Sequence, residues 1–399
     1  MYLLNGVIMK SLRLVYLFPF FFLTYEMAGN LSNDLYLPAM PHIAQQFNTD
    51  VANIGLTIAL WLLGNACFQW LLGPLSDKWG RRTVLFSGGI LFIVSTLMCA
   101  MTSKFAVMLL GRFGQGIGVS SMMITGYASI HEVFSDQEAV KILAWMTSIT
   151  ILAPMMGPLL GGYLLMWVKW PWLFMLIGAL STIGLAGLAL TMPATQNLDP
   201  DSLKWAKMKA GYGGLLKNRR FMGHCLTFAF IYSAIMSWIT ASPGILIDGY
   251  QLSSFDFGLI QCPVFGCYII GAQLSRQSIK KYPSDFIIRW GIAVSGLTAL
   301  ALVILLISGL DALWLLISLM SLVVLGAGMI SAPLNRACFE NASQAKGLVS
   351  SMFYMSLLLG GTLFSALVSL IKIQNPISLS MLISFSTVCA WVSFSTVRA

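Results

Sequence analysis

Charged residues are scarce in this chain. Aspartate, glutamate, lysine and arginine make up 9% of its 399 residues, whereas apolar types make up 58%. A soluble domain carries about 25% charged residues, so this composition cannot supply an ordinary water-facing surface. The scarcity excludes a soluble globular protein and predicts an all-α integral membrane protein.

Signatures of enzymes and metal sites are also missing. The seven cysteines are scattered, mostly in apolar runs, without a CxxC or a Cys/His ligand spacing. We expect them to pack as small hydrophobic side chains. The histidines, His42, His131 and His224, are far apart, and we expect them to be solvated in loops or at helix ends. No Ser/His/Asp set and no P-loop is apparent, so we predict no enzyme, no metal, no cofactor and no direct use of ATP.

Twelve apolar runs can be traced, six on either side of a polar stretch at 193–220. A membrane-spanning helix needs roughly 20 mostly apolar residues. The runs lie at 13–36, 51–72, 83–101, 105–130, 140–165, 172–192, 221–247, 256–275, 286–308, 312–335, 347–371 and 376–396. We therefore predict a six-helix bundle over 1–192, a cytoplasmic linker over 193–220 and a second six-helix bundle over 221–399.

Lysines and arginines are distributed unevenly over the predicted loops. With a cytoplasmic N-terminus, 19 of the 23 fall inside, among them Lys10, Arg13 and Arg398. Three fall outside, namely Lys104, Lys169 and Lys372. This bias matches the positive-inside rule and supports twelve spans with both termini in the cytoplasm. The net charge of +9 is thus a topology signal, and we expect lipid headgroups rather than nucleic acid beside the basic linker.

Two acidic residues interrupt the first apolar run. A charge at the bilayer centre costs roughly 2.5 to 3.5 kcal/mol on insertion scales, so Glu26 and Asp34 require a reason. With about 100° per residue, Glu26, Asn30 and Asn33 share one stripe of a helix and Asp34 lies at its edge. The acids would be ~12 Å apart along the axis. As alternatives to a functional role, Glu26 would be a paired structural acid and Asp34 an interfacial charge.

Arg112 is the one cation inside an apolar run. Gln115 and Gly116 follow at helical spacing and share its face. A buried arginine needs an acceptor, and Glu26, Asp34, Gln115 or backbone carbonyls are the candidates. A carboxylate near the arginine stays ionised, whereas a buried carboxylate without it takes up a proton. Two acids and one arginine are the minimum for a proton switch. In the second half of the chain, no charged residue lies as clearly inside an apolar run, so we expect the ionic chemistry to be concentrated in the first half.

Between the second and third runs, the predicted loop 73–82 reads GPLSDKWGRR. Glycines such as Gly73 and Gly80 permit a tight reversal. We expect Asp77 to accept hydrogen bonds from a nearby helix N-terminus, and Arg81 and Arg82 to hold acidic or carbonyl partners. A basic topogenic turn would explain the arginines alone, so we predict a gate on the cytoplasmic face.

The fifth run carries a face of small residues and prolines. Pro154, Gly157, Pro158, Gly161 and Gly162 recur at the spacing of one helix face. Small residues let helices approach closely and prolines bend them. A generic contact between helices is the alternative, but the two prolines make the pattern more specific.

These features together resemble the major facilitator superfamily, and specifically its twelve-helix drug:proton antiporters. The loop 73–82 is similar to the GxxxDxxGRR signature, the fifth run to the antiporter motif, and Arg112 to Gly118 to the RxxQGxG motif of helix four. The segment YEMAGNLSNDLYLPAMP resembles helix one of exporters of the multidrug facilitator A type and of the bicyclomycin and chloramphenicol resistance group.

The resemblance implies two six-helix bundles about a central cavity that rock to give alternating access. It implies proton coupling by Glu26, Asp34 and Arg112, a gate at 73–82, and export of lipophilic, often cationic small molecules across the inner membrane by a monomer. It assigns substrate contacts, less firmly, to Asn33, Tyr127, Met146, Met236, Ile239 and Phe265. An exporter of one endogenous metabolite, such as a siderophore or amino acid, and a proton-coupled importer stay open as alternatives; a membrane enzyme fits least.

Overall fold

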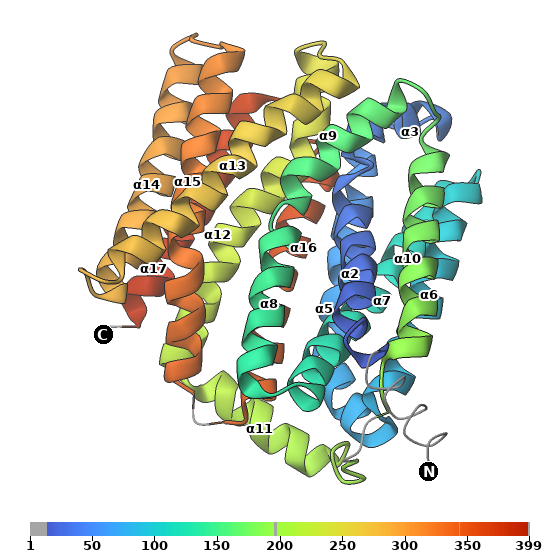
Figure 1. Ribbon diagram of the computed structural model, residues 1–399. Coiled ribbons are helices and arrows are strands. Elements are labelled where there is room, and N and C mark those ends of the chain that lie inside the picture. The colour runs from blue at the N-terminus through green and yellow to red at the C-terminus, as the bar shows by residue number, and fades with distance from the viewer. Residues whose placement is uncertain (1–13, 195–197, 343, 398–399) are drawn as a thin grey trace, which may run out of the picture.

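Helices make up the regular structure of residues 14–194, 198–342 and 344–397, which the computed structural model describes (Figure 1). The first half contains α2 (Phe18–Asp34), η1 (Leu37–Ala39), α3 (Met40–Gln46), α4 (Val51–Ile54), α5 (Leu56–Trp79), α6 (Arg81–Met101), α7 (Phe105–Val133), α8 (Asp136–Thr150), α9 (Ala153–Leu165) and α10 (Pro171–Thr191). The linker contains α11 (Trp205–Lys217). The second half contains α12 (Arg219–Pro243), η2 (Gly244–Gly249), α13 (Ser254–Ser278), α14 (Ser284–Ile307), α15 (Leu313–Glu340), α16 (Lys346–Leu370) and α17 (Pro376–Thr396).

The number of spans agrees with the twelve apolar runs. Within the described residues, ten segments are long and apolar enough to cross a membrane, and the bent pair α8 and α9 makes an eleventh. Helix α2 has 17 residues, which correspond to about 26 Å at 1.5 Å per residue, and the chain continues from it almost directly into η1. We count α2 as the twelfth span, so the predicted all-α membrane fold is confirmed.

The fifth run is not one continuous helix. Helices α8 and α9 meet at an angle of 41° across a short break. Pro154 lies in the first turn of α9, where its missing N–H removes no hydrogen bond of that helix. The bend expected from the prolines is therefore present, and it lies just before Pro154.

The two halves repeat the same close contacts between helices. A Cβ atom at Gly116 in α7 would lie 2.1 Å from the carbonyl oxygen of Trp61 in α5, and one at Gly328 in α15 would lie 2.2 Å from that of Tyr268 in α13. The reverse contacts repeat too, between Gly64 and the Phe113 carbonyl and between Gly271 and the Leu325 carbonyl, each at 2.1 Å. Helices α5 and α7 thus correspond to α13 and α15, and position 112 corresponds to position 324.

The halves touch each other closely at the end away from the linker. We call the end with α11 the linker end and the end with α3 the far end, at the bottom and top of Figure 1. Near the far end, the Ser254 hydroxyl donates to the Pro38 carbonyl at 3.0 Å, and Lys372 pairs with Asp50. At the linker ends of α5 and α16, by contrast, a Cβ atom at Gly73 or Gly347 would meet nothing within 4 Å.

Two expectations about single residues need comment. His224 is buried in α12, with its Nδ1 atom unpartnered, so the expectation that all three histidines are solvated is wrong for this one. The seven cysteines are free thiols, and Cys225 and Cys338 lie with their sulfur atoms 3.7 Å apart. Lys10, Arg13 and Arg398, which belong to the predicted cytoplasmic set, lie outside the described residues.

Candidate functional site: two buried acids and an arginine

Glu26 lies in the middle of α2 with 2% of its surface exposed. Its Oε1 atom accepts a hydrogen bond of 2.5 Å from the hydroxyl of Tyr127 in α7. Its Oε2 atom has no hydrogen-bond partner. The ring of Tyr127 in turn rests edge-on against Phe22, with 5.6 Å between centroids. One oxygen of this carboxylate is therefore held by a hydrogen bond, and the other is available to bind a proton or a ligand.

Asp34 ends α2 and is also buried, with 6% exposure. Its Oδ1 atom accepts a hydrogen bond of 3.2 Å from the side-chain amide of Asn33. A Cβ atom at Gly157 would lie 2.6 Å from the Asp34 Cβ, so Asp34 presses against the Gly/Pro face of α9.

Arg112 is fully buried in α7 and donates four hydrogen bonds, all to neutral acceptors. The acceptors are the carbonyls of Thr57 at 3.2 Å and Ser32 at 2.7 Å, Gln115 at 2.7 Å and Asn33 at 3.2 Å. Its guanidinium also lies 4.6 Å from the centre of the Tyr36 ring. Of the candidate acceptors, Gln115 and backbone carbonyls are used, while the acids are not in direct contact.

Asn33 connects the arginine to one acid. Its Oδ1 accepts from Arg112 and its Nδ2 donates to Asp34. A change of charge on Asp34 therefore reaches Arg112 through a single amide group. The sequence suggested Asn33 as a substrate contact, and the structure places it inside this relay.

The remaining predicted substrate contacts are found in the protein interior. Met146, Met236, Ile239 and Phe265 belong to one large apolar cluster that is built from both halves. Met236 lies near Gly361 of α16, where a Cβ atom would be 3.0 Å from its Cγ. Their role in substrate binding stays a prediction.

The predicted gate sequence 73–82 is mostly helical, which corrects the expectation of a loop. Helix α5 continues to Trp79, and only Gly80, with φ of 92°, separates it from α6. Gly80 makes the reversal, whereas Gly73 is an ordinary helical residue. Among the described residues, no side chain caps the N-terminus of the following helix α6; the Asp77 carboxylate instead pairs with the guanidinium of Arg81 at 2.6 Å.

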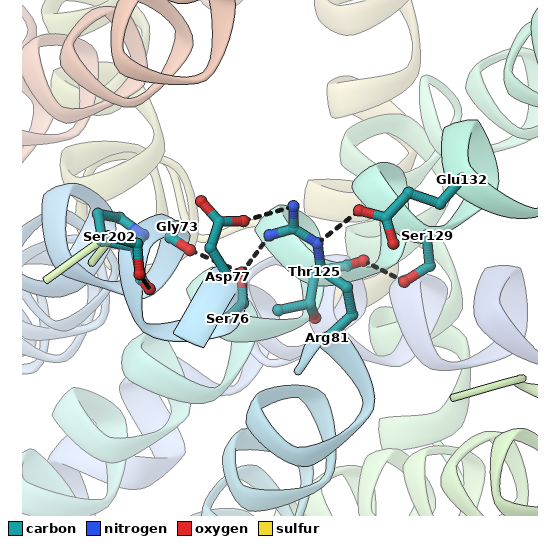
Figure 2. A network of polar contacts seen from close by, with 9 residues as sticks. Gly73, Ser76, Asp77, Arg81, Thr125, Ser129, Glu132 and Ser202 are labelled. Carbon is teal, nitrogen blue, oxygen red and sulfur yellow. Dashed lines mark hydrogen bonds and ion pairs between the residues drawn. The ribbon is translucent and has the colours of Figure 1, made fainter. Parts of the chain in front are cut away.

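Arg81 is the centre of this charged network (Figure 2). It contacts Asp77 and Ser76 of α5 and the carboxylate of Glu132 in α7, the last at 3.0 Å. Arg82 instead donates to the carbonyl of Ala189 in the last turn of α10 at 2.7 Å and to that of Met192, the residue after this helix, at 3.0 Å. The arginines thus hold acidic and carbonyl partners, as expected. Glu132 was missed because it lies 51 residues away from Arg81 in the sequence.

The linker is attached to the gate helix. The hydroxyl of Tyr212 in α11 donates to the Trp70 carbonyl at 2.9 Å. That carbonyl has no helical partner because Pro74, four residues later, lacks an N–H. Burial raises the pKa of Tyr212, which keeps its hydroxyl a neutral donor. Nearby, the Ser202 hydroxyl donates to the Pro74 carbonyl at 2.8 Å.

The Gly/Pro face of α9 has contacts on two sides. A Cβ atom at Gly161 would lie 1.9 Å from the Leu35 carbonyl oxygen, next to Asp34. One at Gly162 would lie 2.3 Å from the Ser254 carbonyl oxygen, in α13 of the second half. The small residues predicted to allow close approach therefore place α9 between the acid-bearing helix and the second half.

Comparison with known proteins agrees with this geometry. A sequence profile of the Major Facilitator Superfamily matches residues 22–395. The chain is 35% identical over 345 residues to the Multidrug transporter MdfA of Edwardsiella piscicida, covering 86% of this chain and 84% of that protein. The chain belongs to the major facilitator superfamily. Homologues of the same name from Yersinia pestis bv. Antiqua (strain Angola) and Escherichia coli O157:H7 are 35% and 34% identical, with the same coverage. The chain is accordingly a transporter and not an enzyme.

Proposed function

We propose that this transporter exports lipophilic, often cationic small molecules across the inner membrane in exchange for protons. The named relatives are multidrug transporters, and the two buried acids of α2 supply groups that can carry a proton. The observation that carries the proposal is Glu26, a buried carboxylate with one oxygen held by Tyr127 and the other without a partner. The protein acts as a monomer, with the linker end and both termini in the cytoplasm.

Asp34 is the second proton site and the one tied to conformation. It contacts the Arg112–Asn33 relay on one side and Gly157 of α9 on the other. Helix α9 packs against α13 of the second half. A neutral Asp34 accepts a weaker hydrogen bond from Asn33 than an ionised one does, so proton uptake loosens the relay and changes the packing of α9. A contiguous chain of contacts thus links the proton to the interface between the halves.

The cycle follows from competition for the acids. An external proton neutralises Glu26 or Asp34 and weakens its attraction for a bound cation, which leaves outward. The proton is then released to the cytoplasm when the next substrate binds. The charged network at Asp77, Arg81 and Glu132 acts at the linker end as the gate that opens and closes during this exchange.

Efflux from proteoliposomes under an imposed pH gradient tests the proposal. We expect gradient-driven export by the wild type, a partial loss in Glu26→Gln and in Asp34→Asn, and no gradient-driven export in the double variant. Glu340→Gln, which removes an exposed acid of the second half, is the control and should behave as wild type. Normal gradient-driven export by the double variant would refute proton coupling through these acids.

Two further readouts separate the alternatives. A pump-deficient strain that expresses the chain should tolerate several unrelated lipophilic drugs, whereas tolerance to a single compound class would favour an exporter of one metabolite. Accumulation of substrate on the linker side would indicate an importer.

A further inference from the structure

A groove of about 190 Å³ lies where α13, α14 and α15 meet, and we call it the α14 groove. It is lined by Ser278, Tyr282, Phe286, Ile287, Trp290 and Met329. Helix α13 begins beside Pro38 at the far end and ends at Ser278, so the groove lies at the linker end. Pockets for drug-sized ligands have roughly 300 to 1,000 Å³. The α14 groove is smaller and suits a single hydrocarbon chain.

The α14 groove faces the bilayer rather than the other half. Helix α14 lies on the outside of the second half, away from the first half (Figure 1). Leu297 and Ile304 follow Trp290 at steps of seven residues and lie within about 40° of it around the helix. These three side chains are 54% to 68% exposed, and large apolar side chains on such a surface contact lipid. Trp290 therefore marks the linker-end border of a lipid-facing stripe.

Three aromatic rings form one wall of the α14 groove. Tyr282 and Phe286 are stacked, with 5.0 Å between ring centroids, and Phe286 and Trp290 follow with 6.0 Å. Tyrosine and tryptophan are enriched where a membrane meets water. Tyr282 and Trp290 are about half exposed, so the hydroxyl and the indole N–H can donate to a lipid headgroup while the rings contact its hydrocarbon.

Four basic residues neighbour the lining residues in the sequence, namely Arg276, Lys280, Lys281 and Arg289. All four are exposed, and none of them forms an ion pair with another described residue. Asp285 is the single acid of this segment. The rim of the α14 groove therefore carries a surplus of positive charge.

The corresponding turn of the first half uses its arginines internally. Helix α6 corresponds to α14, because each follows one of the matched helices α5 and α13. At the start of α6, Arg81 pairs with Asp77 and Glu132, and Arg82 donates to two backbone carbonyls. The cations beside the α14 groove have no such internal acidic partners among the described residues, so their charge is available to an anion from outside the chain.

We propose that the α14 groove binds an anionic phospholipid of the leaflet at the linker end. Its phosphate lies beside Lys280 and Lys281, and one acyl chain follows Trp290 and Leu297 toward the bilayer centre. Basic pockets between spanning helices bind acidic lipid headgroups, and the surrounding bilayer supplies the lipid on the side to which the groove opens. The inference is independent of which solute the transporter carries.

Native mass spectrometry of the purified full chain, titrated with one lipid at a time, tests the proposal. Phosphatidylglycerol should bind at least about fivefold more tightly than zwitterionic phosphatidylethanolamine. The double variant Lys280→Gln, Lys281→Gln should weaken phosphatidylglycerol binding by roughly 5- to 30-fold, because each cation near an acidic headgroup contributes a factor of about five. Lys209→Gln, Lys217→Gln removes the same charge from α11 and is the matched control, with a change of less than about twofold.

A variant that keeps every charge separates the groove from its rim. Ser278→Phe fills the space between α13 and α14 and should also weaken phosphatidylglycerol binding. Equal losses in the two lysine double variants would overturn the proposal, because surface charge in general would then hold the lipid. Unchanged binding in Lys280→Gln, Lys281→Gln would overturn it too, and this variant alters only exposed side chains, so it tests the site even where Ser278→Phe does not fold.

Discussion

Arg112 of α7 and Val324 of α15 occupy equivalent positions, each four residues before a glycine that contacts the neighbouring helix. Both side chains are fully buried. Arg112 donates four hydrogen bonds to groups from α2, α5 and its own helix, whereas Val324 can only pack. The scaffold of helix contacts is therefore duplicated, whereas among the described residues the buried side chains of aspartate, glutamate and arginine, namely Glu26, Asp34 and Arg112, all belong to the first half.

This division suits an exchanger. In the proposed exchange, the second half moves as a rigid body and contributes apolar side chains such as Met236 and Phe265 to binding. In the same proposal, the half with Glu26, Asp34 and Arg112 responds to the proton. The contacts of α9 with both Asp34 and α13 join the responsive half to the passive one.

Among these substitutions, that of Arg112 should have the largest effect on transport. Arg112→Leu leaves buried acceptors at Asn33 and Gln115 without a donor, at about 1 to 3 kcal/mol for each unsatisfied group. We expect transport to fall at least about a hundredfold, whereas Val324→Ala should keep most of the wild-type rate. Arg112→Lys should also fail, because lysine cannot reproduce the fork of donors. Equal transport by Arg112→Leu and Val324→Ala in efflux assays would contradict the division of roles.

The glycine contacts should show the opposite result, equal damage in both halves. Gly116→Ala and Gly328→Ala place a Cβ atom 2.1 and 2.2 Å from a backbone oxygen, and such overpacking costs roughly 1 to 3 kcal/mol. We expect similar drops in thermal stability of the purified protein. Gly73→Ala, where nothing lies within 4 Å, should be neutral or stabilising. A loss confined to one of the two variants would show that the halves do not share their packing.

The charged networks at the linker end should again differ between the halves. Arg81 joins two helices through Asp77 and Glu132, so Arg81→Gln should slow efflux on the order of tenfold, as expected when hydrogen bonds to charged groups are lost. Arg336 makes an exposed pair with Glu340 within α15, and exposed pairs within one helix contribute only about 0.3 to 0.5 kcal/mol. Arg336→Gln should therefore transport normally. A comparable slowing by both variants would assign the effect to surface charge in general.

The smallest effect is expected for the ion pair that joins the two halves. Asp50 and Lys372 lie at the far end with more than half of each side chain exposed, so their pairing contributes roughly 0.2 to 1 kcal/mol. The halves can be in contact or separated at the far end. Lys372→Gln should shift the equilibrium between these two states toward the separated one by less than about fivefold. Energy transfer between dyes on the two far-end loops measures this shift. High salt should reproduce it in the wild type and have little further effect in the variant.

The sequence revealed Glu26, Asp34 and Arg112 because charges inside apolar runs are costly and therefore conspicuous. It also offered Gln115, one turn along the same helix, as an acceptor for Arg112. It did not reveal which backbone carbonyls take part, since those of Ser32 and Thr57 meet Arg112 only through the packing of three helices. The gate was expected as a loop because Gly73 and Gly80 permit a tight reversal. Helix α5 instead continues through Gly73 and Pro74, and the Tyr212 hydroxyl, 142 residues away, binds the carbonyl that Pro74 leaves free.

Proton release on substrate binding tests the exchange most directly. Tetraphenylphosphonium added to the purified protein in weakly buffered solution should release about one proton for each cation bound, because the cation displaces a proton from Glu26 or Asp34. The Glu26→Gln, Asp34→Asn double variant should release none at concentrations where it still binds the cation. Undiminished proton release by that double variant would contradict proton exchange through Glu26 and Asp34, because the exchanged proton would then come from elsewhere in the protein.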